Sequence, residues 1–334
     1  MKLLYALLKT ASFYLLSFAI SLWVLGSFFY LSMMPTWLQI LMTLLVFAGL
    51  ILTFIKFNKK IFSCTLASIF LIVILLFYLD PPTNNRLWAP DQEFFPIIKS
   101  ANKMITIKNF RNFKYRSNTD FDIHWETRTF NLDNLIRVDF IIEPFSNWRG
   151  LAHTFLTFSF SDGEHISISV EIRKEQKEQY SVLAGFYRNY ELIYIIGDER
   201  DLIGLRANIR KDPVYLFPIK AKKDQVKRLF MSMLERANDL AEHPEYYNTL
   251  FNTCSTNITK HLYENFKLDF GFDYRILFPG YADELAFELD LIDTNKSLEE
   301  ARNTFLINKR SQFIDDGKKW SKQIRTTTIN PIKN

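Results

Sequence analysis

The amino-terminal part of this 334-residue chain lacks charge. Residues 10–55 contain no Asp, Glu, Lys or Arg, and Pro35 interrupts this run near its middle. The run is long enough for two membrane-spanning helices of ~20 residues each, with a turn at the proline. A third apolar run, residues 61–79, follows a short basic segment. A cleaved signal peptide would have an apolar region of only ~7–15 residues and a small-residue cleavage site, so we predict three transmembrane helices within residues 1–80.

The turn of the first apolar hairpin also lacks charge, whereas lysines flank the opposite ends of the spans. Lys2 and Lys9 accompany the first span, and three more lysines lie between the second span and the third: Lys56, Lys59 and Lys60. Basic loops stay in the cytoplasm. We therefore predict a multi-pass protein of the inner membrane, with the chain after residue 79 exported to the periplasm.

Cysteine is scarce. Cys64 falls within the third predicted span and Cys254 in the exported part, so on this topology the two cannot meet. A lone thiol in an oxidising compartment indicates a reactive or an intermolecular cysteine. The alternative is that Cys254 is a small buried apolar residue.

Several signatures of cofactor sites are absent from the sequence. There is no glycine-rich phosphate loop, no paired Cys/His spacing typical of a metal site, and no internal repeat. We therefore predict no cofactor and no metal. The net charge of +5 is modest and lies partly in the cytoplasmic lysines and partly in the tail, so it does not indicate a nucleic-acid partner.

Periodicity after the spans predicts an α+β domain with an antiparallel sheet and helices. We expect a linker at 81–98, the exported domain at 99–293 and a charged tail at 294–334, which either is solvated or lies against anionic lipid. Strands are predicted at 135–143, 190–196, 203–209 and 214–219, and helices at 224–242 and 282–291. Residues 198–201 are predicted to form a solvated charged loop.

Residues 152–172 read as a β-hairpin, because both arms alternate with period two around the loop at residues 161–163. A three-residue loop pairs Phe160 with Glu164, and counting back pairs His153 with Glu171. One face of the hairpin is apolar, and the other carries the polar residues. Directly opposed side chains have Cβ atoms ~4.5–5.5 Å apart, so Glu171 can hydrogen-bond the His153 ring. His165, near the turn, is the competing candidate for a base.

A helix capped by Asn252 or Thr253 is predicted to run to residue 266, with Cys254 in its first turn. The positive end of a helix favours a thiolate in its first turn. Cys254 as nucleophile, His153 as base and Glu171 as orienting carboxylate form a candidate triad, since triads are recognised by geometry rather than by order in the chain. The remaining histidines are expected on the surface or in packing: His124, His243 and His261.

The exported part of the sequence resembles the periplasmic domain of the Lnb-type lipoprotein N-acyltransferases. The resemblance covers residues 88–293 and rests on four stretches: NFRNFKYRSNTDFDIHWETRTFNLDNL, the segment that begins LAHTFLTFSFSDGEHISISVEI, YYNTLFNTCSTNI and LFPGYADELAFELDLID. It implies a circularly permuted papain-like, NlpC-type α+β fold. It also implies that Cys254, His153 and Glu171 are catalytic.

These observations predict a membrane-anchored thiol acyltransferase or amidase of the cell envelope. The favoured activity moves an acyl chain from phospholipid to a lipoprotein amino terminus through a thioester. The expected partners are therefore membrane lipid and a lipoprotein or other envelope amine. Two alternatives stay open: a peptidoglycan or peptide hydrolase on the same fold, and a non-catalytic envelope scaffold.

Overall fold

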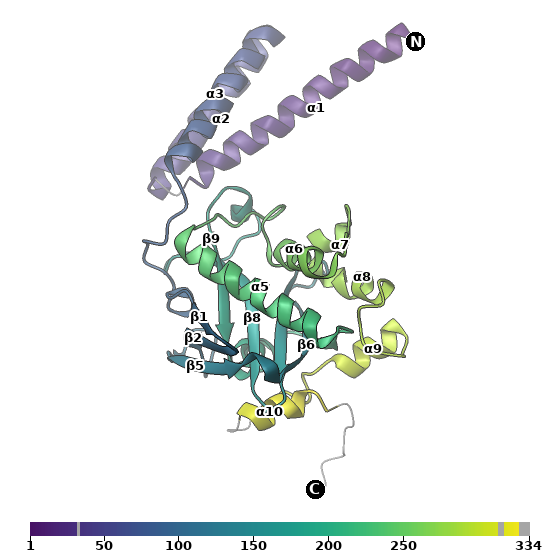
Figure 1. The fold of residues 1–334 in the computed structure, drawn as a ribbon. Helices are drawn as coiled ribbons and strands as arrows, with labels where there is room; N and C mark the ends of the chain where they lie inside the picture. Colours follow the sequence, from purple (N-terminus) through teal and green to yellow (C-terminus); the bar gives the residue numbers. More distant parts are fainter. Residues whose placement is uncertain (32–33, 313–316, 327–334) are drawn as a thin grey trace. The chain divides into compact units, whose positions relative to one another are not determined.

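A computed structural model describes residues 1–31, 34–312 and 317–326 of the protein (Figure 1). The chain divides into two compact units. The first, which we call the membrane unit, comprises Met1–Thr83, Tyr180–Glu191 and Tyr246–Asn248. The second, the sheet unit, takes in the described residues of Asn84–Gln179, Leu192–Glu245 and Thr249–Asn334.

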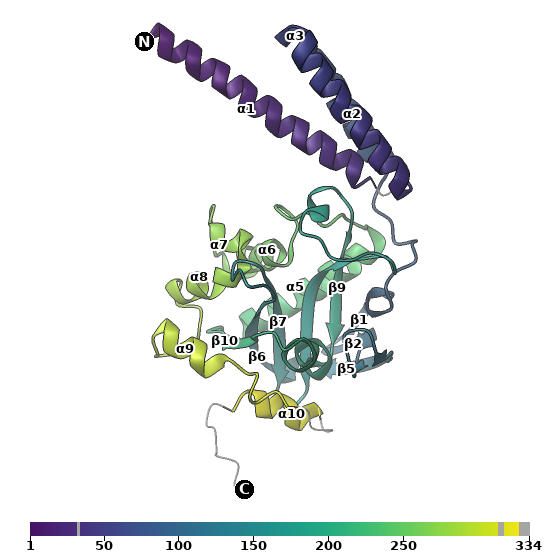
Figure 2. The ribbon, with the colours of Figure 1, turned by 180° about the vertical axis from the view of Figure 1, so that it is seen from behind.

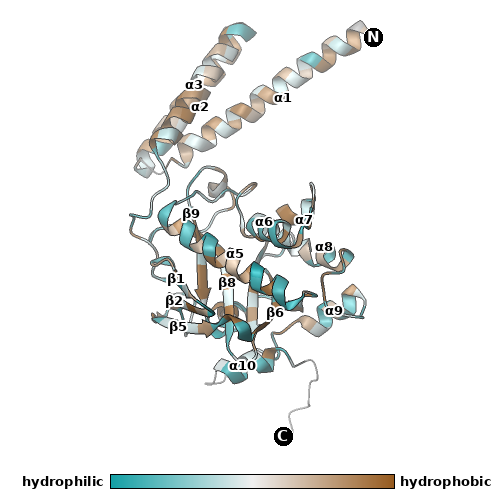
Figure 3. Ribbon diagram, viewed as in Figure 1, coloured by the Kyte–Doolittle hydropathy of each residue, from teal (hydrophilic) through white to brown (hydrophobic). Residues whose placement is uncertain are grey.

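Three long helices dominate the membrane unit: α1 (Lys2–Phe29), α2 (Thr36–Lys56) and α3 (Lys59–Leu79). Within the described residues these are the helices long and apolar enough to cross a membrane, and Figure 3 shows apolar residues along most of their length. Large apolar side chains such as Leu15, Leu44 and Leu71 are exposed. So many exposed apolar side chains suit helices whose solvent is lipid. The three predicted spans therefore agree with three candidate transmembrane helices.

A segment from the middle of the chain belongs to the membrane unit. The Tyr187 ring stacks on Tyr30, with ring centroids 5.2 Å apart, and Arg188 Nη1 donates a hydrogen bond to the Phe77 carbonyl at 2.7 Å. Gly26 lies directly under Tyr187, because a Cβ atom at this position would come within 2.2 Å of the tyrosine oxygen. Glycine thus permits the close approach of this segment to α1.

The sheet unit is built on a mixed sheet that contains eight strands of the described chain, in the order β1-β2-β9-β8-β7-β6-β10 with β5 also paired to β2. The strands are β1 (Ile97–Ala101), β2 (Met104–Arg111), β5 (Trp125–Asn131), β6 (Leu135–Pro144), β7 (Ala152–Phe160), β8 (His165–Arg173), β9 (Glu191–Gly197) and β10 (Tyr215–Pro218). A separate two-stranded ribbon joins β3 (Lys114–Tyr115) to β4 (Phe121–Asp122). The α+β prediction is confirmed, but the sheet is not purely antiparallel, because β2 meets β9 in parallel at Arg111 and Gly197.

Helices cover both faces of this sheet. On one face lie α5 (Lys223–Glu242) and α6 (Cys254–Phe266), and α5 passes in front of the sheet in Figure 1 and behind it in Figure 2. On the other face, α4 (Glu199–Gly204), the π-helical segment η4 (Leu205–Arg210) and α10 (Gly317–Ile324) bury a second apolar cluster that includes Phe155 and Trp320. The polar face of the predicted hairpin is therefore buried as well, with Thr157 and Ser167 fully inaccessible.

Two local predictions, the strand at 203–209 and the solvated loop at 198–201, are wrong. Residues 203–209 form the end of α4 and η4 instead of a strand, because Asp198 caps α4 by accepting a hydrogen bond from the Arg200 N–H at 2.9 Å. The charged segment before them is not solvated, since Glu199 and Asp201 are both fully buried. Their charges are compensated by arginines distant in sequence, Arg325 and Arg111. Sequence periodicity carries no information about such partners.

The ends of the exported chain pack into the sheet unit. Trp88, within the predicted linker, is only 5% exposed, and the Arg173 guanidinium lies 4.2 Å from the centroid of its ring. In the predicted tail, α9 (Leu298–Phe305) and α10 bury Ala301, Trp320 and Ile324 completely. Residues 313–316 and 327–334 of that tail lie outside the described residues. Two further helices, α7 (Tyr274–Leu277) and α8 (Ala282–Glu288), follow α6.

Candidate functional site

The hairpin of β7 and β8 has the predicted register. The paired residues run from Ser159 with His165 to Leu156 with Ile168, which is the register that aligns His153 with Glu171 beyond the last pair. The turn closes through a hydrogen bond from the Phe160 N–H to the Glu164 carbonyl at 2.9 Å. On its other side β7 pairs with β6, where Glu143 lies opposite His153. Two carboxylates therefore flank the histidine along the sheet.

A serine connects the candidate base to its carboxylate. His153 Nε2 lies 2.7 Å from Ser169 Oγ, and this hydroxyl donates to Glu171 Oε1 at 2.8 Å. The direct separation of Nε2 and Oε1 is 4.0 Å, too long for a hydrogen bond. Because Ser169 gives its one proton to Glu171, the bond to the ring requires a proton on Nε2. The lone pair of the neutral imidazole is then on Nδ1, which makes no hydrogen bond within the described part of the chain.

Buried arginine charge sets the ionisation of this group. Burial alone would raise the pKa of Glu171, but Arg206, Arg111 and His153 hold that pKa well below its ordinary value. Arg206 Nη2 donates to Glu171 Oε1 at 2.9 Å, and Arg206 Nε donates to Glu143 Oε2 at 2.5 Å. Burial, reinforced by Arg206, lowers the pKa of His153 to about 3. At neutral pH the carboxylate is therefore ionised and the imidazole neutral.

Glu143 has a different ionisation from Glu171, although both contact Arg206. Its carboxylate is fully inaccessible, and burial raises its pKa to about 7 despite the nearby Arg206 and Arg210. Arg206 thus lies between two carboxylates, one firmly charged and one close to titration at neutral pH. The arrangement fixes the position of the arginine that holds Glu171.

Cys254 lies in the first turn of α6, as predicted, and is its first residue, because Thr253 is the one of the two candidates that caps the helix. Thr253 Oγ1 accepts from the Thr256 N–H at 3.2 Å, and the Thr256 hydroxyl accepts in return from the Thr253 N–H at 2.7 Å. The thiol is 9% exposed. Thr154 Oγ1 donates to Cys254 Sγ at 3.7 Å, and Ser255 Oγ lies 3.8 Å from the same sulfur.

The structure assembles part of the predicted triad. His153 and Glu171 are brought together through Ser169, and the thiol lies beside Thr154, the residue next to His153 on β7. Successive side chains of a strand point to opposite faces. The imidazole thus faces Arg206 on one side of the sheet while Thr154 faces α6 on the other. Between Cys254 Sγ and the imidazole there is no hydrogen bond in the described structure.

The other histidines lie away from this site. His165 is at the turn end of the hairpin, where its Nδ1 lies 3.0 Å from the Gly163 carbonyl oxygen. His261 is buried between Ser232 and Tyr194, at 2.8 and 2.9 Å. His124 and His243 have side chains more than half exposed. The structure adds Ser169 to the predicted residues, as the link between His153 and Glu171.

The fold and this group of residues define a membrane-anchored α+β protein, with a histidine–serine–glutamate relay on the sheet and a cysteine at the start of a helix that packs on that sheet. Residues 121–280 match the family model of the Lnb N-terminal periplasmic domain. That part of the chain is therefore an Lnb-type periplasmic domain, and His153, Glu171 and Cys254 all lie within it. Together with the three candidate transmembrane helices, the match places the protein in the membrane and this domain in the periplasm. No curated protein and no solved structure matches the chain.

Proposed function

We propose that the protein is a cysteine acyltransferase that moves an acyl chain from phospholipid to the amino terminus of a lipoprotein. The observation that carries the proposal is the relay of His153, Ser169 and Glu171 on the sheet against which the helix that begins at the buried Cys254 packs. A helix that bears cysteine, packed on a sheet that bears histidine, is also the arrangement expected of a permuted papain-like fold. The Lnb-type domain supports the same chemistry.

In the first half-reaction Nδ1 of His153 takes the proton of Cys254, and the thiolate attacks the ester carbonyl of the lipid. The first N–H groups of α6 have no partner within the helix and stabilise the oxyanion. The carbon–oxygen bond of the ester then breaks, and the leaving alkoxide takes the proton from His153. An acyl thioester and a lysolipid result.

In the second half-reaction the acceptor amine attacks the thioester. His153 takes a proton from the amine, the carbon–sulfur bond breaks, and the thiolate recovers a proton from the imidazole. The product is an amide on the lipoprotein. In the described structure Cys254 Sγ lies beside Thr154 on one side of the sheet, and the His153 ring faces the other side. The mechanism therefore requires the thiol and the imidazole to come together at the end of β7 when substrate binds, since catalytic hydrogen bonds often form only in the substrate complex.

The test is to incubate the purified full-length protein with phospholipid and no acceptor. We expect the protein to gain one acyl mass, located on Cys254 and released by hydroxylamine. The adduct should be absent in Cys254→Ala and present in Cys64→Ala, a matched control that removes the other cysteine of the chain. A diacylated lipopeptide with a free amino terminus should discharge the adduct. Discharge to water alone would indicate a hydrolase, and no adduct with any envelope lipid would refute the proposal.

A further inference from the structure

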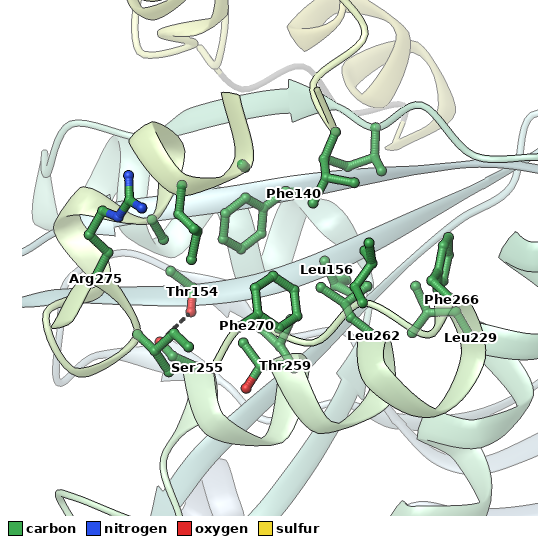
Figure 4. Close-up of a pocket in the computed structure, with 18 of the residues that line it drawn as sticks. Phe140, Thr154, Leu156, Leu229, Ser255, Thr259, Leu262, Phe266, Phe270 and Arg275 are labelled. Atoms are coloured by element: carbon green, nitrogen blue, oxygen red, sulfur yellow. Dashed lines mark hydrogen bonds between the residues drawn. The ribbon is translucent and has the colours of Figure 1, made fainter. Parts of the chain in front are cut away.

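An apolar cavity begins beside the candidate nucleophile. It lies between β6 and β7 on one side and α6, α7 and α8 on the other, and it has a volume of about 70 Å³ (Figure 4). Its lining is apolar except for four residues, which are Thr154, Ser255, Thr259 and Arg275.

The polar end of the cavity adjoins the thiol. Thr154 Oγ1 and Ser255 Oγ lie 3.2 Å apart, and both are within 3.8 Å of Cys254 Sγ. Figure 4 shows these two residues at one end of the cavity, and Leu229 and Phe266 at the other. A molecule that fills the cavity thus has one end at the sulfur.

The charged residue of the lining is neutralised by neighbours. Arg275 forms ion pairs with Asp273 and Glu288, each at 2.6 Å. Its guanidinium is therefore already paired, and its aliphatic stem forms part of the cavity wall. The cavity consequently lacks a free charge among its lining residues that would attract a phosphate headgroup.

The length of the lining matches one acyl chain. The lining residues of α6 extend from Ser255 to Phe266, which corresponds to ~16 Å at a rise of 1.5 Å per residue. One leaflet is half of a hydrocarbon core ~30 Å thick, so its chains are ~15 Å long. A peptide segment would fit the same space poorly, because its backbone polar groups would lose their hydrogen bonds among apolar walls.

We propose that this cavity binds the acyl chain that is transferred, with the reacting carbonyl at the Thr154–Ser255 end beside Cys254. The proposal rests on the proposed acyltransferase function and adds the site that holds the acyl group. It implies that the cavity sets the preference for chain length, because a longer chain reaches further toward Leu229 and Phe266.

The experiment compares Leu262→Trp, which fills the middle of the cavity, with Tyr263→Trp, the next residue on α6, whose side chain is exposed and does not line it. The full-length protein is given dihexanoyl- or dipalmitoyl-phosphatidylcholine, and the rate of acyl adduct formation on Cys254 is measured. We expect Leu262→Trp to lower the dipalmitoyl rate relative to the dihexanoyl rate by roughly tenfold or more. Tyr263→Trp should leave the ratio unchanged. An unchanged ratio in folded Leu262→Trp would overturn the proposal.

A second measurement needs neither turnover nor a cavity variant. Palmitic acid with a terminal diazirine is photolysed with Cys254→Ala protein, and the crosslinked residues are identified. Crosslinks near Leu229 and Phe266 support the cavity. If they appear while the wild-type protein forms no thioester, acyl binding stands and the transfer reaction is wrong. If thioester forms but the crosslinks lie elsewhere, the acyltransferase stands and the cavity proposal is wrong.

Discussion

Replacing Ser169 by alanine tests the relay at its centre. The hydroxyl joins His153 Nε2 and Glu171 Oε1, at 2.7 and 2.8 Å, and the two ends are 4.0 Å apart without it. In Ser169→Ala the carboxylate keeps its bond from Arg206, so it remains ionised. The imidazole loses the contact that selects its tautomer and orientation.

The size of the effect follows from the lost hydrogen bonds. A bond to a neutral partner contributes ~0.5–1.5 kcal/mol and one to a charged partner ~1.5–3 kcal/mol. A loss of about 2 kcal/mol of transition-state stabilisation corresponds to a rate of acyl transfer that is roughly 30-fold slower. The free energy of unfolding should fall by only about 1 kcal/mol, because the deleted group is small and Glu171 stays paired.

The assay is the rate of acyl adduct formation on Cys254, with thermal unfolding measured on the same samples. Ser167→Ala is the matched control, because Ser167 is also fully buried on β8 and faces the same side, but its hydroxyl has no hydrogen-bond partner among the described residues. It should retain the wild-type rate. The reasoning is refuted if Ser169→Ala keeps full activity, or if both variants lose activity equally.

Three further predictions concern the buried charges. Glu171→Gln should retain a measurable fraction of the rate while Cys254→Ala retains none, because an orienting group contributes less than the nucleophile; full activity in Glu171→Gln would contradict the relay. Burial lowers the pKa of His153 from 6.5 to about 3, so only the unfolded chain gains this proton as the pH falls below 6.5. Between pH 6.5 and 5 the wild type should therefore lose up to ~2 kcal/mol of unfolding free energy relative to His153→Gln, as measured by denaturant titration. Equal pH dependence of the two proteins would mean that this histidine is not buried in its neutral form. Arg111→Leu should lower the unfolding free energy by ~3–5 kcal/mol because it leaves Asp201 buried without its partner, and an unfolding midpoint equal to that of the wild type would exclude the buried pair.

Several features of the protein could be predicted from sequence because they depend on neighbours along the chain. Three spans follow from the length of uncharged apolar runs. The hairpin register follows from period-two alternation and a three-residue turn. A cap before Cys254 follows from the capping residues Asn252 and Thr253, of which the structure selects Thr253. The residues of the candidate site, His153, Glu171 and Cys254, were found in this way. Their roles stay a prediction.

Only the tertiary structure decided how these residues are connected. Ser169 bridges the base and the carboxylate, whose Nε2 and Oε1 atoms are 4.0 Å apart, a distance that pairing rules do not specify. Arg206 belongs to η4, a segment whose sequence predicted a strand. The helix α10 covers the face of the hairpin that carries Phe155, and alternation did not indicate that this face is covered. Alternation reports which side chains share a face, not what covers that face. Contacts between residues remote in the chain depend on packing and on burial of charge, and these exist only once the whole domain has folded.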